Sequence, residues 1–529
     1  MGVSFFIKGT LFLEAVNQVI VSLEKNYDAT FCGKLPIHQT NSIQPHGVLL
    51  LLDDSINTVL QVSENVDELL QQPAREVAGI SVSAILSPQS IHSLRTTIRE
   101  KINEKIPLTL SFNVKEGEEQ VLCLVHTVEE GCIIEASLKS FYPQQGRTFI
   151  HIYQRVKQVI QYINQCETLN EVCQVAVQEL KKVTGFDKVM IYRFDEEWNG
   201  TVLAEEAEGG MERYLGLTFP ASDIPKPARD MYVKNPYRLI PNREYETVKL
   251  YPLINPVSKG FTNLLNADLR SVATVHLEYL KNMQVMASMS ARILYQDKLW
   301  GLIACHHREP KYLSFEECSV VEMISNIVSQ KIASLQNAEG ILLKQQLTRQ
   351  FATLVESFVN KNSMMEAFLE NAELLQEFLH ANGVAICWEG HIETFGQTPD
   401  QGDIETLVYW LRQKARQQIF HEHQLPLVFE EGRSFTKTGS GILALPIQPD
   451  KGNYLIAFRA EIITTISWGG NPNDAVQFEP NSTIYHPRHS FKVWQQTVHQ
   501  TAAPWHSEEV AAAEQFRNFL VQHTLNRLN

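Results

Sequence analysis

Short apolar runs recur over residues 43–142, separated by turn residues and by two helical stretches. Runs of this length that are bounded by turn residues are typical of strands. We expect strands at residues 48–52, 59–62, 108–112, 121–125 and 132–134. The pattern predicts a small α+β domain.

A second domain is predicted to begin with one amphipathic helix near residues 152–180, where apolar residues recur at helical spacing. Strand-like segments follow at residues 188–194, 201–204, 286–295 and 299–305. Between them lies a long insert, residues 240–268, which is rich in proline and asparagine. A loop of that length inside a compact domain is usually functional.

Residues 315–359 carry a continuous helical pattern without proline and with one glycine, Gly340. As a single helix they would measure about 68 Å at about 1.5 Å per residue, which exceeds the core helix of one domain. We therefore predict a helical spine that links two domains. Its apolar stripe would pair with a second copy of the chain in a homodimer.

A third α+β domain is expected over residues 360–510, followed by a terminal helix over 507–528. Between Phe458 and Trp505 the chain is rich in Trp, Asn, Pro and Gly, which predicts an extended hairpin arm. Exposed tryptophans are unfavourable, so the arm should dock on another surface. The alternative is a hairpin inside the domain that carries ordinary aromatic residues.

The composition narrows the class of protein. A chain of 529 residues suggests three or four domains. Its net charge of −14 makes binding to nucleic acid or to an anionic membrane through bulk charge a poor hypothesis. No apolar stretch approaches the roughly 18 residues that span a bilayer. The eight cysteines form no CxxC pair, which argues against a metal site and for the reducing cytoplasm.

Cys32 is the first candidate for chemistry. It lies in an irregular segment ahead of the motif Ser42-Ile-Gln-Pro-His-Gly47. A thiol outside any periodic element can act as a nucleophile that forms a thioether. The alternative is a small buried hydrophobic residue.

A second candidate is the motif Phe219-Pro-Ala-Ser-Asp-Ile-Pro225. Pro225 disfavours the helical conformation at Ile224, so the backbone carbonyls near Asp223 can point away from the chain. Carbonyls beside a carboxylate suit a cationic N–H ligand. The alternative is a helix N-terminus capped by Ser222 or Asp223.

The third candidate combines the segment 268–280 with the later residues 288–290 and 302–307. Arg270 can hold a carboxylate through two hydrogen bonds, whereas His276 also fits a satisfied core histidine. His306 and His307 are adjacent on a predicted strand and therefore point to opposite faces, which makes them a poor metal site.

In this order and spacing, the motifs resemble the photosensory module of phytochromes over essentially the whole chain. Within that family the chain resembles a biliverdin-binding bacteriophytochrome of the cyanobacterial kind. Leu277 stands where plant and many cyanobacterial phytochromes carry their bilin-linking cysteine. Cys32 stands where bacteriophytochromes attach biliverdin, upstream of Pro36-Ile-His38.

The resemblance implies an α+β fold of three domains (PAS, GAF and PHY) with antiparallel sheets, long connecting helices and the extended hairpin arm. It also implies an N-terminal figure-of-eight knot, in which the N-terminal segment passes through the insert 240–268. The expected boundaries are an N-terminal extension at 1–27, PAS at 28–145, GAF at 146–335 and PHY at 336–529. The arm, called the tongue, spans about 458–505.

The implied function is that of a red/far-red photoreceptor. It would bind biliverdin covalently through Cys32, switch by Z/E isomerisation at the D-ring, and signal through the tongue and the spine. No enzyme activity is expected, because the chain shows no phosphoacceptor-histidine box or ATP lid. A response regulator would then be reached only through an output module. A sensor of a small metabolite or a cyclic nucleotide is the alternative, since GAF and PAS folds host many ligands; a bilin lyase is a third reading.

The resemblance also implies roles for individual residues, grouped by the part of the chromophore that they would contact. The pyrrole nitrogens would meet the Asp223 carbonyl, with Ile224 and Pro225 beside it, and His276. The propionates would be bound by Tyr232, Arg238, Arg270, Ser288 and Ser290, and the D-ring would be lined by Tyr192, Phe219, Tyr279 and His306. The tongue residues would be Trp468, Gly469, Gly470, Pro487, Arg488, Ser490 and Phe491, with Arg488 pairing with Asp223.

Overall fold

The computed structural model describes residues 39–99, 105–115, 117–142, 149–361, 363–414, 418–474, 476–478 and 485–528. It divides into two compact units. The first comprises residues up to 333 together with 468–494, and the second comprises 334–467 together with 495–529. Cys32 and the N-terminal segment of the predicted knot lie outside the described residues.

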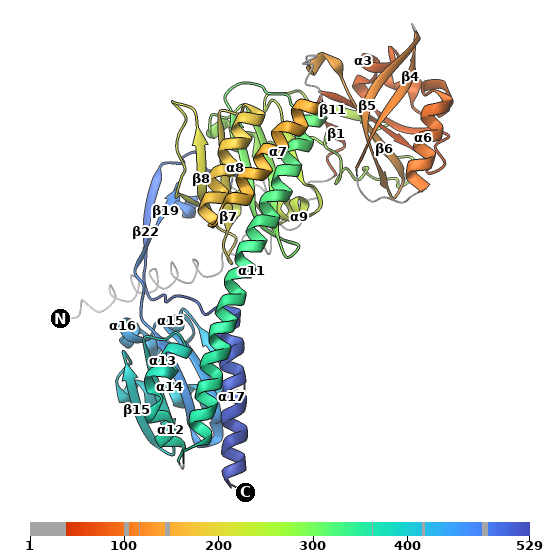
Figure 1. The fold of residues 1–529 in the computed structure, drawn as a ribbon. Coiled ribbons are helices and arrows are strands. Elements are labelled where there is room, and N and C mark those ends of the chain that lie inside the picture. The colour runs from red at the N-terminus through yellow and green to blue at the C-terminus, as the bar shows by residue number, and fades with distance from the viewer. Residues whose placement is uncertain are drawn as a thin grey trace, which may run out of the picture. The chain divides into compact units, whose positions relative to one another are not determined.

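The first unit contains a seven-stranded sheet in the order β1-β11-β3-β2-β6-β5-β4 (Figure 1). Its strands include all five that were predicted from the apolar runs. They are β1 (Ser42–Ile43), β2 (Gly47–Leu52), β3 (Val59–Ser63), β4 (Ile106–Val114), β5 (Gly117–Val128), β6 (Gly131–Ser137) and β11 (Val248–Tyr251). A core forms where this sheet meets α3 (Asp67–Leu70), α4 (Ala74–Val77), α5 (Val82–Ile85) and α6 (Pro88–Arg99).

Strand β11 comes from the insert 240–268, for which the sequence predicted only irregular structure. It pairs antiparallel with β1 on one side and with β3 on the other. Gln61 on β3 fixes the turn after β11, because its side-chain amide donates to the Pro252 carbonyl at 2.6 Å. The insert is therefore an integral part of the first sheet.

An eight-stranded sheet in the order β10-β12-β13-β7-β8-β9-β19-β22 carries the second domain. Its strands are β7 (Lys188–Phe194), β8 (Gly200–Ala207), β9 (Thr218–Phe219), β10 (Tyr237–Ile240), β12 (Ala287–Tyr295), β13 (Lys298–His307), β19 (Thr464–Gly469) and β22 (Val493–Val498). The arm joins this sheet where Trp468 pairs in parallel with Thr218. A short hairpin of β20 (Val476–Phe478) and β21 (Tyr485–Pro487) lies further along the arm.

The helix predicted near residues 152–180 is wrong as a single element. The structure has two helices, α7 (Phe149–Gln165) and α8 (Leu169–Thr184). A capping box starts α8: the Glu171 amide donates to Thr168 Oγ1 at 3.3 Å, and the Thr168 amide donates to the Glu171 carboxylate at 3.2 Å. These reciprocal bonds satisfy the first free amides of a helix and so favour a new start there.

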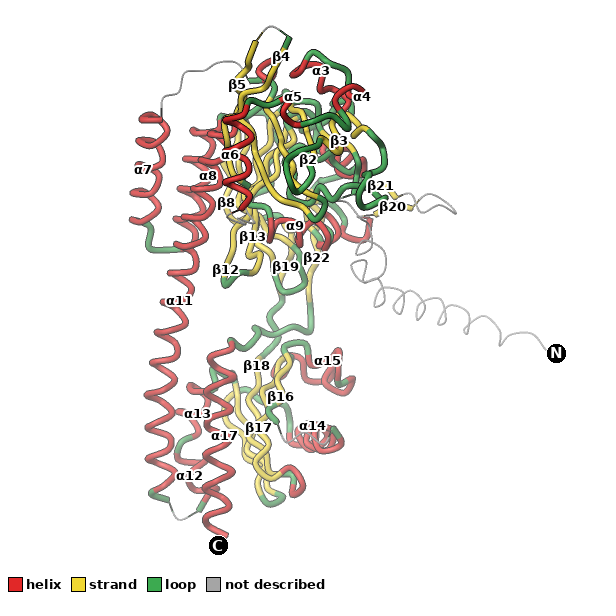
Figure 2. The backbone as a smooth tube through the Cα atoms, turned by 90° about the vertical axis from the view of Figure 1, so that its right-hand side faces the viewer, coloured by secondary structure: helices red, strands yellow, loops and turns green. Residues whose placement is uncertain are grey.

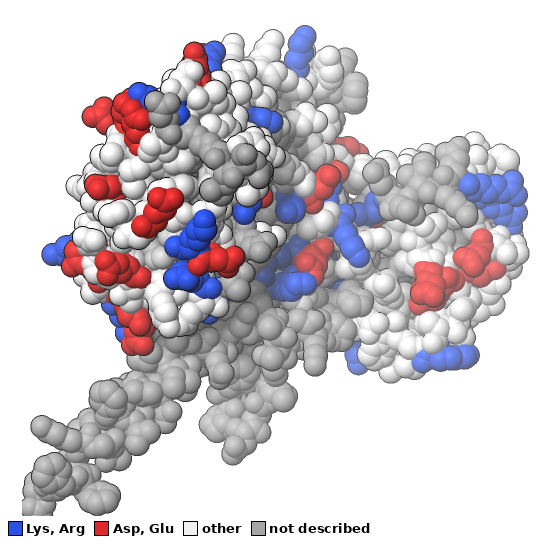
Figure 3. Space-filling view, turned by 90° about the horizontal axis from the view of Figure 1, so that it is seen from below, with Lys and Arg blue, Asp and Glu red and all other residues white. Residues whose placement is uncertain are grey.

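The predicted spine is confirmed as one helix, α11 (Phe315–Val359), of 45 residues. The terminal helix is also confirmed, as α17 (Ser507–Leu528). Both are visible in Figure 2 as long helical runs. Within the described residues, no helix is both long and apolar enough to cross a membrane. On the face drawn in Figure 3, basic and acidic side chains are interspersed.

The second unit is built on a five-stranded antiparallel sheet in the order β15-β14-β18-β17-β16. Its strands are β14 (Gly383–Trp388), β15 (His391–Gly396), β16 (Phe420–Glu422), β17 (Gly441–Gln448) and β18 (Asn453–Arg459). One face packs on α11, α12 (Met364–Glu370), α13 (Ala372–Phe378) and α17. The other packs on α14 (Gln401–Gln413) and α15 (Leu425–Val428) (Figure 2), and α16 (Thr436–Gly439) lies beside β18.

Phe516 lies at the centre of the helical face of this second core. It is fully buried, and its ring centroid lies 5.6 Å from those of both Phe358 and Phe378. We predict that Phe516→Ala lowers the free energy of unfolding by about 3–5 kcal/mol, because it leaves a cavity. Leu525→Ala on the same helix is the control, since Leu525 is 53% exposed. Equal urea midpoints for the two variants would contradict this packing.

Candidate functional site

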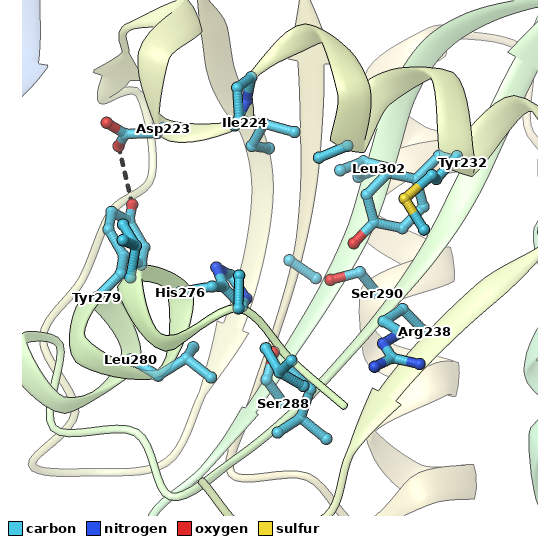
Figure 4. A pocket seen from close by; sticks show the side chains of 18 of the residues that line it. Asp223, Ile224, Tyr232, Arg238, His276, Tyr279, Leu280, Ser288, Ser290 and Leu302 are labelled. Carbon is cyan, nitrogen blue, oxygen red and sulfur yellow. Dashed lines mark hydrogen bonds between the residues drawn. The ribbon is translucent and has the colours of Figure 1, made fainter. Parts of the chain in front are cut away.

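A cavity of about 280 Å³ lies in the first unit, between the eight-stranded sheet and two helices, α9 (Lys226–Lys234) and α10 (Thr274–Asn282) (Figure 4). This volume is near the lower end of the roughly 300–1,000 Å³ that is usual for small-molecule sites. Apart from Cys32, which lies outside the described residues, the residues that were expected to contact a chromophore all line the cavity: Tyr192, Phe219, Asp223, Ile224, Pro225, Tyr232, Arg238, Arg270, His276, Tyr279, Ser288, Ser290 and His306. Pro487 of the arm lines it as well.

Asp223 lies at one end of the cavity, at the end of a 3₁₀ turn (Ala221–Asp223). Tyr279 donates its hydroxyl proton to Asp223 Oδ2 at 2.8 Å (Figure 4). The Arg488 guanidinium pairs with the same carboxylate, and both side chains are buried. Burial works against the charge of Arg488, but Asp223, together with Tyr279 and Tyr192, raises the pKa of Arg488. The predicted Arg488–Asp223 pair is confirmed.

The arm closes tightly around Arg488. The guanidinium also donates to the Gly469 carbonyl at 2.6 Å, and Asn282 of α10 donates to the Arg488 carbonyl at 3.0 Å. A side chain at Gly469 would lie 2.6 Å from the Phe219 ring. Gly470 has a φ of +100°, and a Cβ there would lie 2.3 Å from the Ser490 carbonyl oxygen. Glycine at both positions therefore lets the arm approach the carboxylate.

The other arm residues surround this contact. Trp468 is buried at the end of β19, and Phe491 packs edge-to-face on Tyr279 with ring centroids 5.2 Å apart. Ser490 is exposed, and its hydroxyl accepts a hydrogen bond from the Lys492 amide at 3.4 Å.

The hypothesis of a helix cap at Ser222 or Asp223 is wrong. The following helix, α9, begins after Pro225, and no side chain caps it. Ile224 adopts an irregular conformation, with φ −127° and ψ 82°. The Arg229 guanidinium donates a hydrogen bond to the Ile224 carbonyl at 2.8 Å. The Asp223 side chain does not cap a helix and pairs with Arg488 instead.

Two arginines, of which Arg270 is buried and Arg238 half-buried, lie on another side of the cavity. Arg238, on β10, donates to the Asp268 carbonyl at 2.8 Å and also to the Arg270 carbonyl. Arg270 donates to the Leu265 carbonyl at 3.1 Å. Burial and the neighbouring Arg238 lower the pKa of Arg270 to about 9. Both guanidinium groups therefore donate to main-chain carbonyls. That they bind a carboxylate of a ligand stays a prediction.

Polar side chains on the sheet complete this side of the cavity. Ser288 and Ser290 on β12 are two residues apart and therefore share one face of the strand. Tyr232 on α9 lines the same side of the cavity. In Figure 4, Tyr232, Ser290 and Arg238 lie opposite Asp223 and Tyr279, with His276 between the two groups.

The two cavity histidines are neutral. His276 lines the cavity. Desolvation by the surrounding protein, together with Arg238, lowers the pKa of His276 to about 4. Burial, Lys188 and His276 lower the pKa of His306 to about 3. His306 Nδ1 is buried and has no hydrogen-bond partner in the described part of the chain, and an orphaned polar atom of this kind calls for a ligand or water.

His307 points away from His306, as the strand alternation predicted. It lies 3.2 Å from Asp187, outside the cavity lining. Over the described ranges, no three His, Cys, Asp or Glu side chains gather in a way that could hold a metal ion.

Sequence reasoning missed the charged residues behind the two arginines. Glu135 lies on β6 of the first sheet, and Lys105 directly precedes β4. Both side chains contact the segment that contains Asp268. Lys105 and Asp268 are 163 positions apart. No local pattern connects residues at such a distance.

Comparison with known proteins gives this site its context. Three family models match successive parts of the chain: the PAS fold at residues 32–137, the GAF domain at 168–332 and the phytochrome region at 347–529. Cyanobacterial phytochrome B of Nostoc sp. is 34% identical over 513 residues, which cover 97% of this chain and 68% of the relative. The chain belongs to the phytochrome family.

Other phytochromes support the same assignment. Cyanobacterial phytochrome A of Nostoc sp. is 35% identical over 95% of this chain and 66% of its own length. The crystal structure of a bacteriophytochrome from the photosynthetic bacterium R. palustris has a TM-score of 0.82 at 30% identity, covering 94% of this chain and 99% of that one. The predicted three-domain α+β phytochrome fold is confirmed. The chain spans about two thirds of the length of these curated phytochromes.

His46 is a buried histidine whose protonation should change the stability of the fold with pH. His46 is 6% exposed, and burial together with Arg238 lowers its pKa from 6.5 to about 4. His46 is therefore protonated near pH 6.5 in the unfolded chain, but only near pH 4 in the folded chain. We predict that this histidine removes up to about 3 kcal/mol from the free energy of unfolding as the pH falls across that window.

Urea unfolding at intervals between pH 7 and pH 4 measures this effect. His46→Gln should give a shallower fall in stability with decreasing pH than the unaltered chain. Parallel curves for the two proteins would rule out His46 as the titrating group.

Proposed function

We propose that this chain is a red/far-red photoreceptor that binds biliverdin, held covalently by Cys32, and signals through its arm. The observation that carries the proposal is the composition of one cavity. A buried carboxylate tied to the arm lies at one end, a pair of arginines lies on another side, and neutral histidines lie among aromatic and apolar walls. When bound, biliverdin supplies the red absorption and the double bond beside its D-ring whose Z/E isomerisation separates two states.

The arginine side of the cavity suits the two propionates. Arg238 and Arg270 are fixed by main-chain carbonyls, so their positions are set before a ligand enters. Guanidinium groups bind carboxylates through paired hydrogen bonds. The hydroxyls of Tyr232, Ser288 and Ser290 line the same cavity and would share this task.

His276 and the Asp223 main chain suit the pyrrole nitrogens. A buried cationic ring system is costly unless dipoles or carboxylates solvate it. A neutral imidazole can accept a hydrogen bond from an N–H group, and the low pKa of His276 keeps it in that form. Ile224 and Pro225 hold the adjoining backbone against the cavity.

The D-ring would lie among Tyr192, Phe219, Tyr279 and His306. Apolar ring faces leave a terminal ring free to rotate, and the unpaired Nδ1 of His306 offers one specific hydrogen bond. Tyr279 also binds Asp223. A movement of the ring would therefore act on Asp223 and, through it, on Arg488.

The other proposals follow from the family. The domain boundaries at residues 28–145, 146–335 and 336–529, a homodimer along α11, a cytoplasmic location, and a response regulator reached through an output module are proposed on this basis. The chain itself would act as a sensor and not as an enzyme.

Mixing the purified chain with biliverdin tests both light sensing and attachment. We expect a red absorption band that decreases under red light and recovers afterwards. On a denaturing gel, zinc-induced bilin fluorescence should remain with the chain and be lost in Cys32→Ser, while native Cys32→Ser keeps the red band. Absence of a band would favour a metabolite or cyclic-nucleotide sensor instead.

Cys305→Ala is the matched control for attachment. Cys305 lies on β13 beside His306, but it is fully buried, and burial raises the pKa of its thiol to about 12. The thiolate is the nucleophile, so this variant should keep its gel fluorescence. Fluorescence that persists in Cys32→Ser would assign the bond to another cysteine.

A second prediction concerns the arm. Arg488→Ala leaves the buried Asp223 charge without its cationic partner, a change that typically costs about 3–5 kcal/mol. We expect biliverdin attachment to persist, while the arm strands β19 and β22 exchange amide hydrogens faster in the dark. Illumination of the unaltered chain should change exchange most within residues 460–505, where a hairpin would give way to a helix.

Lys492→Ala is the control, because Lys492 is exposed on the same arm. It should leave exchange unchanged. Equal protection of the arm in dark and light would replace refolding with a rigid-body movement.

A further inference from the structure

A second layer of charge lies behind the arginines of the cavity. Lys105 precedes β4 of the first sheet, and its ammonium pairs with the Asp268 carboxylate. Tyr237 donates its hydroxyl proton to the other oxygen of the same carboxylate at 2.9 Å. The Lys105 and Asp268 side chains are only 14% and 20% exposed. The pair therefore joins the PAS and GAF parts of one compact unit.

Asp268 lies close to both arginines. Its main-chain carbonyl accepts a hydrogen bond from Arg238 at 2.8 Å, and Arg270 is two residues further along the chain. The negative charge of Asp268 acts on both guanidinium groups. Without compensation, this carboxylate would compete with a carboxylate of a ligand for the same two cations.

Lys105 supplies that compensation. Burial opposes the ionisation of Asp268, but the Lys105 ammonium, the Tyr237 hydroxyl and Arg238 together lower the pKa of the carboxyl. Removal of Lys105 would lower the charge of the cluster by one and leave the Asp268 carboxylate with Tyr237 as a hydrogen-bond donor and with the arginines as neighbouring cations. Buried charges interact strongly because little water screens them.

Glu135 on β6 holds the segment in register. Its two carboxylate oxygens accept the amide protons of Asp268 at 3.1 Å and of Leu269 at 2.6 Å. These two hydrogen bonds to one buried carboxylate fix the backbone immediately before Arg270. The first sheet thus sets both the position and the charge of this side of the cavity.

We propose that Lys105 is a positioning residue for ligand carboxylates: by neutralising Asp268 it keeps Arg238 and Arg270 available to the propionates of the bilin. The inference rests on the proposed function. It makes the PAS domain part of the binding site, although Lys105 does not line the cavity.

The test compares biliverdin with its dimethyl ester, which has the same ring system but no carboxylates. The half-saturating pigment concentration is read from the rate at which the red band appears in the full chain. Lys105→Met should raise this concentration for biliverdin on the order of tenfold, equivalent to about 1.4 kcal/mol. It should leave the value for the ester unchanged, because the ester makes no ionic contact with the arginines.

Two further variants separate charge from packing. Lys105→Arg keeps the charge and should bind biliverdin as the unaltered chain does. The double variant Lys105→Met/Asp268→Asn removes both charges and should recover most of the lost affinity. Such recovery is the sign of a direct energetic coupling between two residues.

Several results would overturn the inference. They are unchanged biliverdin binding in Lys105→Met, an equal loss for biliverdin and the ester, or a double variant as weak as the single one. A red band that appears with biliverdin in the unaltered chain keeps the photoreceptor proposal standing in each of these cases. Its absence with both pigments would overturn the photoreceptor proposal and this inference together.

Discussion

The buried ion pair between Arg488 and Asp223 is the constraint on which the organisation of the first unit depends. Arg488 is 2% exposed, and removing a guanidinium from water costs several kcal/mol unless a partner and further acceptors meet it. Asp223 and the Gly469 carbonyl provide them. Burial of Arg488 is favourable only beside the Asp223 carboxylate, so the ion pair selects one docking position for the arm.

That requirement extends to the residues around the pair. Positions 469 and 470 require glycine, because a side chain there would clash with the Phe219 ring and with the Ser490 carbonyl, respectively. Tyr279 binds the same carboxylate and packs on Phe491. A single carboxylate therefore touches the cavity and the arm at once. Through Asn282 and Arg488, the cavity helix α10 is also bonded to a segment 206 positions further along the chain.

The elements that could be predicted best from the sequence are those set by a local repeat of apolar residues. The helix α11 and the helix α17 are continuous apolar repeats without proline, and their ends match the expectation. The break between α7 and α8 was missed because the capping box at Thr168 interrupts an otherwise continuous repeat. The cavity residues were identified through motifs of the family. Lys105 was not, because its partner Asp268 is brought near only by the packing of one domain on another.

Strand β11 carries a consequence for dividing the chain. It belongs by sequence to the second domain, but both of its neighbours, β1 and β3, belong to the first sheet. Cutting the chain between the two sheets would strip this strand of both partners, and unpaired strand edges invite pairing with other chains. The same cut would take Glu135 away from the amides before Arg270. The two domains thus belong to one compact unit and should be kept together in engineered fusions. Moving one domain alone would expose an unpaired strand edge in the fusion protein.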